Sequence, residues 1–243
     1  MVEISLKDLI KVYGLASIGK LVGGMIHNIN GPLQNLGMDL EMLNMASAHQ
    51  GQPDSDMEKK TDNRLKRMNE EFENIIQLVK TTSMKVNMIE EVGEYFNLNH
   101  FLQEEISFLK ANLYFKHNVQ MTMELADQSP LLGELHENVP LSLSWFLQGL
   151  VEVVEKHGIK KLGLKTISSP PVYKVILTTE GGRLPDRFLA LLEMDWSSSE
   201  ILQIENEDVG MKLAMFCIKT VGGSLTYQSE GPRFNIILEI PLS

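Results

Sequence analysis

The chain has 243 residues, 43% of them hydrophobic and 22% charged, which is the composition of a globular protein able to bury a sizeable core. Its formal net charge of −10 opposes attraction to a phosphate backbone and argues against nucleic-acid binding. The single cysteine, Cys217, excludes an internal disulfide. The stretch after Met1 has no secretory-signal core, and no run approaches the ~20 consecutive apolar residues of a membrane helix. We therefore expect a cytoplasmic protein without membrane insertion.

Two segments near the start of the chain have helical periodicity. In the second, apolar residues recur at alternating intervals of three and four, interrupted only by Thr82: Leu65, Met68, Phe72, Ile75, Val79, Thr82, Val86 and Ile89. The first carries a similar stripe with polar or helix-bending interruptions: Leu15, Ile18, Val22, Met25, Ile29, Pro32, Leu36, Asp39 and Leu43. Such heptad spacing is typical of helices that pack against other helices. The polar stretch 46–62 contains Gly51 and Pro53 and is typical of a loop.

The two predicted helices would form an antiparallel hairpin, which cannot by itself cover both of its apolar faces. Pairing of two copies would give a dimeric four-helix bundle, so the sequence predicts a homodimer. The alternative is that a later part of the same chain covers the stripe. On either interpretation, residues 1–94 form a first, helical domain.

From residue 95 onward the pattern changes to shorter helices and strands. We expect helices at 98–117, 140–158 and 210–223, strands at 118–126, 159–167 and 172–180, and a β-hairpin at 224–242 that turns near 230–232. Pro140 and Gly158 mark the two ends of the second helix. Helices mixed with hairpin strands predict an α+β sandwich over residues 95–243, with a mixed sheet as one layer and helices as the other.

His27 lies inside the first helical segment, in the stretch MIHNINGPLQ. If Val22 and Met25 take heptad positions a and d, His27 takes f, the position farthest from the helix-packing seam, and faces water. A metal-ligand role is not supported, because no His, Cys, Asp or Glu stands three or four residues away along the helix. An ordinary surface histidine remains the alternative to a chemically active one.

The helical neighbours of His27 are small. Residues three and four positions away are Gly23, Gly24, Asn30 and Gly31. Each helical glycine costs roughly 0.5–1 kcal/mol relative to alanine, so three of them around one histidine are unfavourable without a use. We expect these glycines to let another backbone approach the imidazole.

These residues carry a resemblance to a known family. The stretch 15–43, LASIGKLVGGMIHNINGPLQNLGMDLEML, resembles the phosphoacceptor segment of bacterial sensor histidine kinases, in which A-S-L-G-E-L-A-A-G-I-A-H-E-I-N-N-P-L is a typical pattern. The matching positions are Ala16, Ser17, Gly19, Leu21, Gly24, His27, Ile29, Asn30, Pro32 and Leu33. Stretches 96–109 and 218–242 resemble the entry and the last helix and hairpin of the family's ATP-binding domain. The resemblance implies a dimeric bundle carrying His27, followed by a GHKL-type (Bergerat-like) sandwich.

The chain departs from the family at the phosphoacceptor. The family has an acid directly after the histidine, which takes a proton during autophosphorylation; here that residue is Asn28, which cannot act as a base at neutral pH. Four residues after the histidine the family has an Asn or Thr that positions water for phosphatase activity. Here Gly31 stands there and has no polar side chain.

The nucleotide-binding motifs are also altered. Alignment with the family puts Glu152 at the Mg²⁺-binding asparagine and Thr179 at the adenine-binding aspartate, in a loop that keeps Gly181 but has Arg183 for its second glycine. In the second glycine loop Gly210 remains, but Lys212 fills the place where backbone must approach phosphate. Losing a hydrogen bond to a charged group typically costs about 1.5–3 kcal/mol. We therefore expect that ATP is not bound productively and that no cofactor is required.

Three functions follow from this reading. The first is a histidine phosphotransferase that passes phosphate between His27 and receiver-domain aspartates without ATP; Lys20, on the same helix line, could neutralise the phosphoryl group or simply be solvated. The second is a non-catalytic pseudokinase that binds and regulates a response regulator or kinase. The third is an active histidine kinase with a divergent pocket, which alone would need ATP and Mg²⁺.

Overall fold

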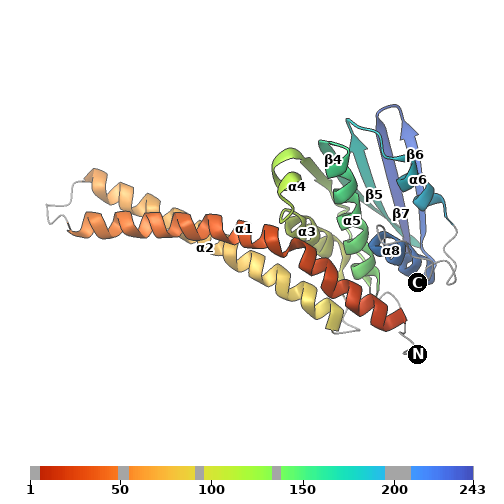
Figure 1. Ribbon diagram of the computed structural model, residues 1–243, viewed down its shortest axis with the longest axis horizontal. Helices are drawn as coiled ribbons and strands as arrows, with labels where there is room; N and C mark the ends of the chain where they lie inside the picture. The colour runs from red at the N-terminus through yellow and green to blue at the C-terminus, as the bar shows by residue number, and fades with distance from the viewer. Residues whose placement is uncertain (1–5, 49–54, 91–95, 133–137, 195–208, 243) are drawn as a thin grey trace.

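The computed structural model describes residues 6–48, 55–90, 96–132, 138–194 and 209–242. A long helical hairpin, α1 (Leu6–Ala48) and α2 (Ser55–Glu90), projects from a compact α/β part (Figure 1). Helix α1 continues through Pro32. The predicted loop at 46–62 was too long, because both helices extend into it; Lys59 and Lys60 are good helix formers. The predicted domain boundary after residue 94 falls at 91–95, outside the described residues.

The α/β part contains two sheets. Strands β1 (Phe96–Asn97) and β3 (Leu131–Leu132) form a short antiparallel pair. The main sheet has the order β2-β4-β5-β7-β6. Its strands are β2 (Gln120–Glu124), β4 (Lys161–Ser169), β5 (Val172–Glu180), β6 (Ser224–Glu230) and β7 (Arg233–Pro241). Only β2 and β4 pair in parallel. The predicted turn between β6 and β7 is confirmed, with Gly231 at φ +63°, a conformation that favours glycine.

Helices form the second layer. They are α3 (Leu98–Leu109), α4 (Leu113–Asn118), α5 (Val139–Lys156), α6 (Asp186–Glu193) and α8 (Val209–Thr220). Helices α3, α5 and α8 lie between the sheet and the hairpin (Figure 1), so the predicted sandwich is confirmed. The helix expected at 98–117 is instead divided, because Asn112 caps α4 by accepting a hydrogen bond from the Phe115 amide at 2.8 Å. Helix α6 and the two-residue strands were not predicted.

The core of the sandwich lies between the sheet and α5. Trp145 and Phe146 of α5 belong to the same buried cluster as the inward side chains of the sheet, including Tyr173 and Val175 of β5. The alternation of buried and partly exposed residues along β5 follows from its period of two. Because α5 is buried along most of its length, its last turns are fixed in position where α1 crosses them.

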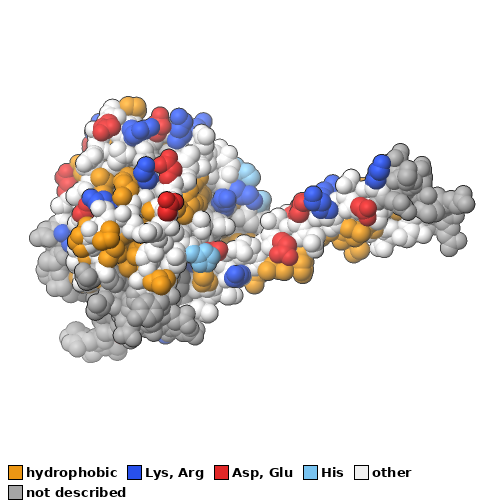
Figure 2. All heavy atoms as spheres, turned by 180° about the vertical axis from the view of Figure 1, so that it is seen from behind, with side chains coloured by type: hydrophobic (Ala, Val, Ile, Leu, Met, Phe, Trp, Pro, Cys, Tyr) orange, Lys and Arg blue, Asp and Glu red, His pale blue; other side chains and the backbone are white. Residues whose placement is uncertain are grey.

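The hairpin leaves much apolar surface exposed, visible as orange patches along it in Figure 2. On α1 these side chains are Leu15, Val22, Ile26, Leu33 and Leu40, and on α2 they are Leu65, Phe72, Ile76 and Val79. By length and composition, α1 also contains one segment that could cross a membrane, Asp8–Ser47, with a mean hydropathy of 1.4 in its most apolar window. Polar residues interrupt this segment, so it contains no uninterrupted apolar run.

The sandwich covers one end of the predicted apolar stripe. Met25, predicted to face the bundle seam, is buried against Phe108 and Ala111 of the sandwich. Ile18 and Tyr13 also pack against the sandwich core. The alternative in which a later part of the same chain covers the stripe therefore holds for this end of α1, while the distal part stays uncovered.

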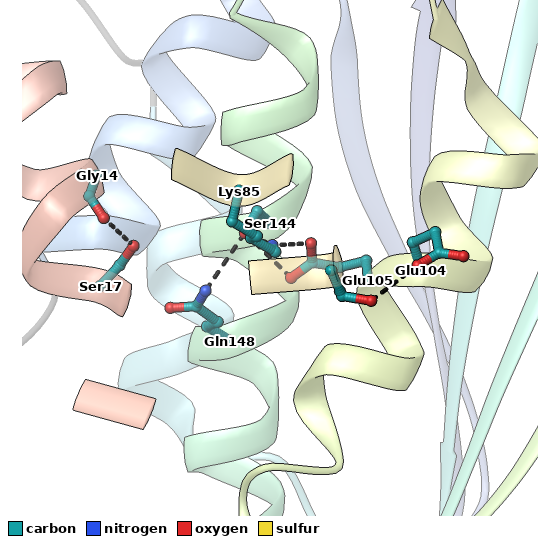
Figure 3. A network of polar contacts seen from close by, with 8 residues as sticks. Gly14, Ser17, Lys85, Glu104, Glu105, Ser144 and Gln148 are labelled. Atoms are coloured by element: carbon teal, nitrogen blue, oxygen red, sulfur yellow. Dashed lines mark hydrogen bonds and ion pairs between the residues drawn. The ribbon is translucent and has the colours of Figure 1, made fainter. Parts of the chain in front are cut away.

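A buried polar network fixes the hairpin to the sandwich (Figure 3). Lys85 of α2 forms an ion pair with Glu105 of α3, and both side chains are almost completely buried. Lys85 also donates a hydrogen bond to Ser144 of α5 at 2.6 Å, and Ser144 donates to Glu105 at 3.0 Å. Burial lowers the pKa of Lys85, and the neighbouring carboxylate of Glu105 opposes that shift. These contacts hold α2, on which α1 packs, in a fixed relation to the sandwich.

Candidate functional site

His27 is exposed on α1, as its predicted heptad position requires. The three neighbouring glycines have different surroundings. A Cβ added at Gly23 or Gly31 would meet nothing within 4 Å, whereas one at Gly24 would collide with the Ala111 carbonyl oxygen. A backbone therefore does approach closely at Gly24, as expected. It is the backbone of Ala111, in this chain's own sandwich, and not that of another protein. Gly23 and Gly31 leave open space beside the imidazole.

Asn28, where the family has an acid, is turned toward the sandwich. Its Nδ2 donates a hydrogen bond to the Lys110 carbonyl oxygen at 3.0 Å, and its Oδ1 accepts one from Lys116 Nζ at 2.7 Å. Both polar atoms of the amide are thus engaged in contacts between α1 and the segment around the start of α4. Asn28 joins the two parts of the molecule next to the histidine.

Lys20 points to the sandwich rather than standing free beside His27. Its Nζ lies 3.2 Å from Glu152 Oε1, on the residue that aligns with the family's metal-binding asparagine. Glu152 is therefore paired with a cation from this chain. Lys20 is thus paired within the chain, and the phosphoryl-neutralising role considered for it stays a prediction.

Tyr13 of α1 occupies the space between α5 and the start of α8. Its ring packs edge-on against Trp145 with the centroids 5.2 Å apart. Its hydroxyl lies so close to Gly210 that an added Cβ there would collide with it. Burial raises the pKa of Tyr13, and the nearby Lys20 partly opposes the shift. A neutral phenol thus lies at the N-terminus of α8, where the resemblance places phosphate.

The remaining cavity at this place is small, about 50 Å³. It is lined by Tyr13, Lys20, Trp145, Gln148, Gly149, Glu152, Val153, Lys156, Phe188, Gly210 and Met211. Small-molecule sites generally have volumes of roughly 300–1,000 Å³. Of the four residues aligned with the nucleotide motifs, Glu152 and Gly210 line the cavity, whereas Thr179 and Gly181 do not. Among the described residues, no group of three or more His, Cys, Asp or Glu could hold a metal ion.

Thr179 is completely buried in β5, and its hydroxyl has no hydrogen-bond partner among the residues that the structure describes. Gly181 follows at φ +91°, and Arg183 forms an exposed ion pair with Asp186 at 2.8 Å. The loop aligned with the family's adenine-binding motif therefore has a buried threonine, Thr179, where the family has an aspartate carboxylate. The loop's cation, Arg183, is already paired with the first residue of α6.

Replacing Thr179 by valine is expected to raise the free energy of unfolding by about 1 kcal/mol, because a buried hydroxyl without a partner is unfavourable and valine has nearly the same shape. Urea denaturation measures the difference. Thr226→Val, at an exposed position of β6, is the matched control and should change stability by less than about 0.5 kcal/mol. A loss of stability in Thr179→Val would show that the hydroxyl has a favourable role.

Two contributors to this region were not found from the sequence. Tyr13 lies ahead of the heptad stripe, and Lys116 lies in the second half of a segment predicted as one helix. Neither belongs to a local motif. Only the packing of α1 on the sandwich brings them to Gly210 and Asn28 respectively.

No protein-family model matches the chain, and no curated protein matches it. Solved structures similar to it include the histidine kinase AdeS of Acinetobacter baumannii, at 12% identity and a TM-score of 0.45, over 89% of this chain and 98% of that one. A bacterial phosphotransferase is similar at 14% identity and a TM-score of 0.45, over 98% of each chain. The histidine kinase ThkA, in complex with the response regulator protein TrrA, is similar at 17% identity and a TM-score of 0.45, over 96% of this chain and 64% of that one.

These similarities are too low to assign an activity. The chain has the helical hairpin followed by an α/β sandwich that its resemblance to the sensor histidine kinases implies. The chemistry must therefore be inferred from the residues of this chain.

Proposed function

We propose that the protein acts in two-component signal transduction as a histidine phosphotransferase, relaying phosphate between His27 and receiver-domain aspartates without ATP. One observation carries the proposal. The helix that exposes His27 also inserts Tyr13 between Trp145 and Gly210, where the resemblance to the kinases would put the nucleotide. A chain with an open histidine and a filled nucleotide cavity can take phosphate only from an already activated donor.

Phosphate transfer from an aspartyl phosphate needs little from this chain. A lone pair of the neutral imidazole forms the N–P bond, and the P–O bond to the aspartate breaks. Its electron pair leaves with the carboxylate, while the proton on the other ring nitrogen stays in place. No proton acceptor is needed, so an amide at Asn28 is compatible with the reaction. The receiver would supply Mg²⁺ and the acidic pocket.

The groups that a nucleotide would need are engaged within the chain. The Tyr13 hydroxyl lies beside Gly210 in the first turn of α8, and Lys20 is paired with Glu152. Binding of ATP would have to displace an aromatic ring from Trp145 and break an ion pair. Neither cost would be repaid by an adenine-binding carboxylate, because Thr179 stands in its place.

The surface around His27 suits a docking protein. Ile26 and Leu33 are 54% and 50% exposed, and Gly23 and Gly31 leave the helix backbone open. An apolar, low-relief helix face beside the acceptor histidine would allow a receiver to bring its aspartyl phosphate close. This exposed face beside His27 supports the proposed partner, a response-regulator receiver domain.

We further propose that the chain is a homodimer, in which exposed stripes on α1 and α2 form a four-helix bundle. Phe72 is 55% exposed and Val79 is 53% exposed in the single chain. Phe72→Glu should convert a dimer to a monomer, because a buried carboxylate would face the partner helices. Light scattering after gel filtration measures the mass, with Glu73→Gln as the control. A monomeric wild-type protein would refute the bundle.

The ATP independence is tested by titrating the purified protein with ATP and Mg²⁺ in a calorimeter. We expect no saturable binding at millimolar nucleotide and no self-labelling of His27. Tyr13→Ala should also remain unlabelled, since Thr179 and Asn28 are unchanged. Saturable binding with labelling that requires His27 would instead establish the active-kinase alternative.

A further inference from the structure

The sandwich reaches the phosphoacceptor region through the short connection between α3 and α4. The carbonyl of Ala111 packs directly on the backbone of Gly24, where any side chain would collide. Met25 is buried against Phe108 and Ala111. These contacts lie within one helical turn of His27. The start of α4 is therefore held beside the histidine by backbone packing as well as by side chains.

Asn28 fixes one basic side chain at this place. Its amide nitrogen is bound to the Lys110 carbonyl oxygen, which orients the amide so that its oxygen faces Lys116. Lys116 Nζ donates to that oxygen at 2.7 Å. An ammonium from 88 positions later in the chain is thus held by the residue that follows His27 in the sequence.

The charge of Lys116 is left uncompensated. Its side chain is exposed, and over the described part of the chain no carboxylate pairs with it. Lys20, by contrast, is neutralised by Glu152. Histidine and basic side chains gather beside the junction of hairpin and sandwich on the face drawn in Figure 2. In a protein with a net charge of −10, the unpaired ammonium of Lys116 is a local positive charge.

We propose that Lys116 binds the phosphoryl group while it is transferred to or from His27, and that Asn28 is the positioning residue that holds the ammonium there. This inference rests on the proposed phosphotransferase function. The sandwich would then supply a phosphate-binding cation in place of binding a nucleotide. An ammonium donating to a phosphoryl oxygen forms a charge-assisted hydrogen bond, which is among the stronger kinds in proteins.

The amide at position 28 then has a specific use. A carboxylate in its place would pair with Lys116 and cancel the charge that the phosphoryl group needs. An amide oxygen holds the ammonium without neutralising it. Asn28→Asp should therefore strengthen the contact between the two parts of the molecule and yet slow transfer, an outcome that a purely structural role would not produce.

The test follows the rate of His27 labelling in two arms. One donor is phosphoramidate, and the other is a set of receiver domains from the source organism, each phosphorylated with acetyl phosphate. Lys116→Ala and Asn28→Asp should each slow labelling in both arms by about tenfold, the size expected for one charge-assisted hydrogen bond. Lys116→Arg should restore most of the rate. Lys219→Ala, at an exposed lysine in the last turn of α8, is the matched control and should match the wild type.

The outcomes separate this inference from the function on which it rests. If the wild type is labelled and Lys116→Ala is labelled as fast as Lys219→Ala, Lys116 has no part in transfer and the inference fails alone. Faster labelling of Asn28→Asp than of the wild type would also overturn it. If the wild type takes no label in either arm, the phosphotransferase proposal fails and this inference fails with it.

Discussion

Replacing His27 by alanine is expected to abolish the acid-labile phosphate that the protein accepts from a phosphorylated receiver. Alanine has no nucleophilic nitrogen, so the N–P bond cannot form. Because His27 is exposed and the contacts of α1 with the sandwich near it are made by other residues, Gly24, Met25 and Asn28, the substitution should leave folding unchanged. Label retained after a denaturing gel at alkaline pH, and lost after acid, measures the result.

The matched control is His117→Ala, which removes another exposed histidine, in α4. It should accept phosphate at the wild-type rate. Label that persists in His27→Ala would place the acceptor elsewhere and contradict the site assignment. A wild-type protein that binds receivers but never takes label would instead favour the pseudokinase alternative.

Replacing Lys85 by methionine is expected to lower the free energy of unfolding by about 3–5 kcal/mol, the usual cost of leaving one partner of a buried ion pair alone. Glu105 would remain buried with only Ser144 donating to it. The contact of the ammonium with the Phe108 ring, 4.8 Å from the centroid, would also be lost. Chemical denaturation followed by circular dichroism measures the change.

The double variant Lys85→Met/Glu105→Leu is the informative control. Replacing both charges of a buried pair by apolar groups of similar size is often neutral or stabilising, so the double variant should recover most of the loss. A loss of less than about 1 kcal/mol in the single variant would show that the pair is not needed to fix the hairpin.

The position of His27 could be predicted because heptad periodicity carries its own geometry. Spacing of apolar residues alone places position f away from the packing seam, and the histidine is exposed there. The same rule failed for Met25, which faces the sandwich instead. A heptad pattern of apolar residues indicates that one face of a helix is buried, but it does not indicate which part of the protein covers that face.

The sandwich could also be predicted in outline. Alternating residues in β4 and β5 and the glycine turn before β7 marked strands that the structure contains. Helix α6 was missed because eight residues give too few turns for its periodicity to be distinct. The break between α3 and α4 depends on one asparagine cap, which was overlooked inside an amphipathic pattern.

The position of Tyr13 in the small cavity beside Gly210 could not be predicted from motifs. The altered residues Glu152 and Thr179 indicated a weakened site, but the role of Tyr13 arises from contacts between parts of the chain that are far apart in sequence. The same is true of Lys116 and Asn28. Such pairs have no characteristic spacing, so only the packing of α1 on the sandwich reveals them.

The most direct test offers the purified wild-type protein phosphate from two sources in parallel. One sample receives a receiver domain carrying labelled aspartyl phosphate, free of nucleotide, and the other receives labelled ATP with Mg²⁺. We predict acid-labile label on His27 in the first sample and none in the second. Label from ATP, with none from any phosphorylated receiver, would contradict the proposed phosphotransfer.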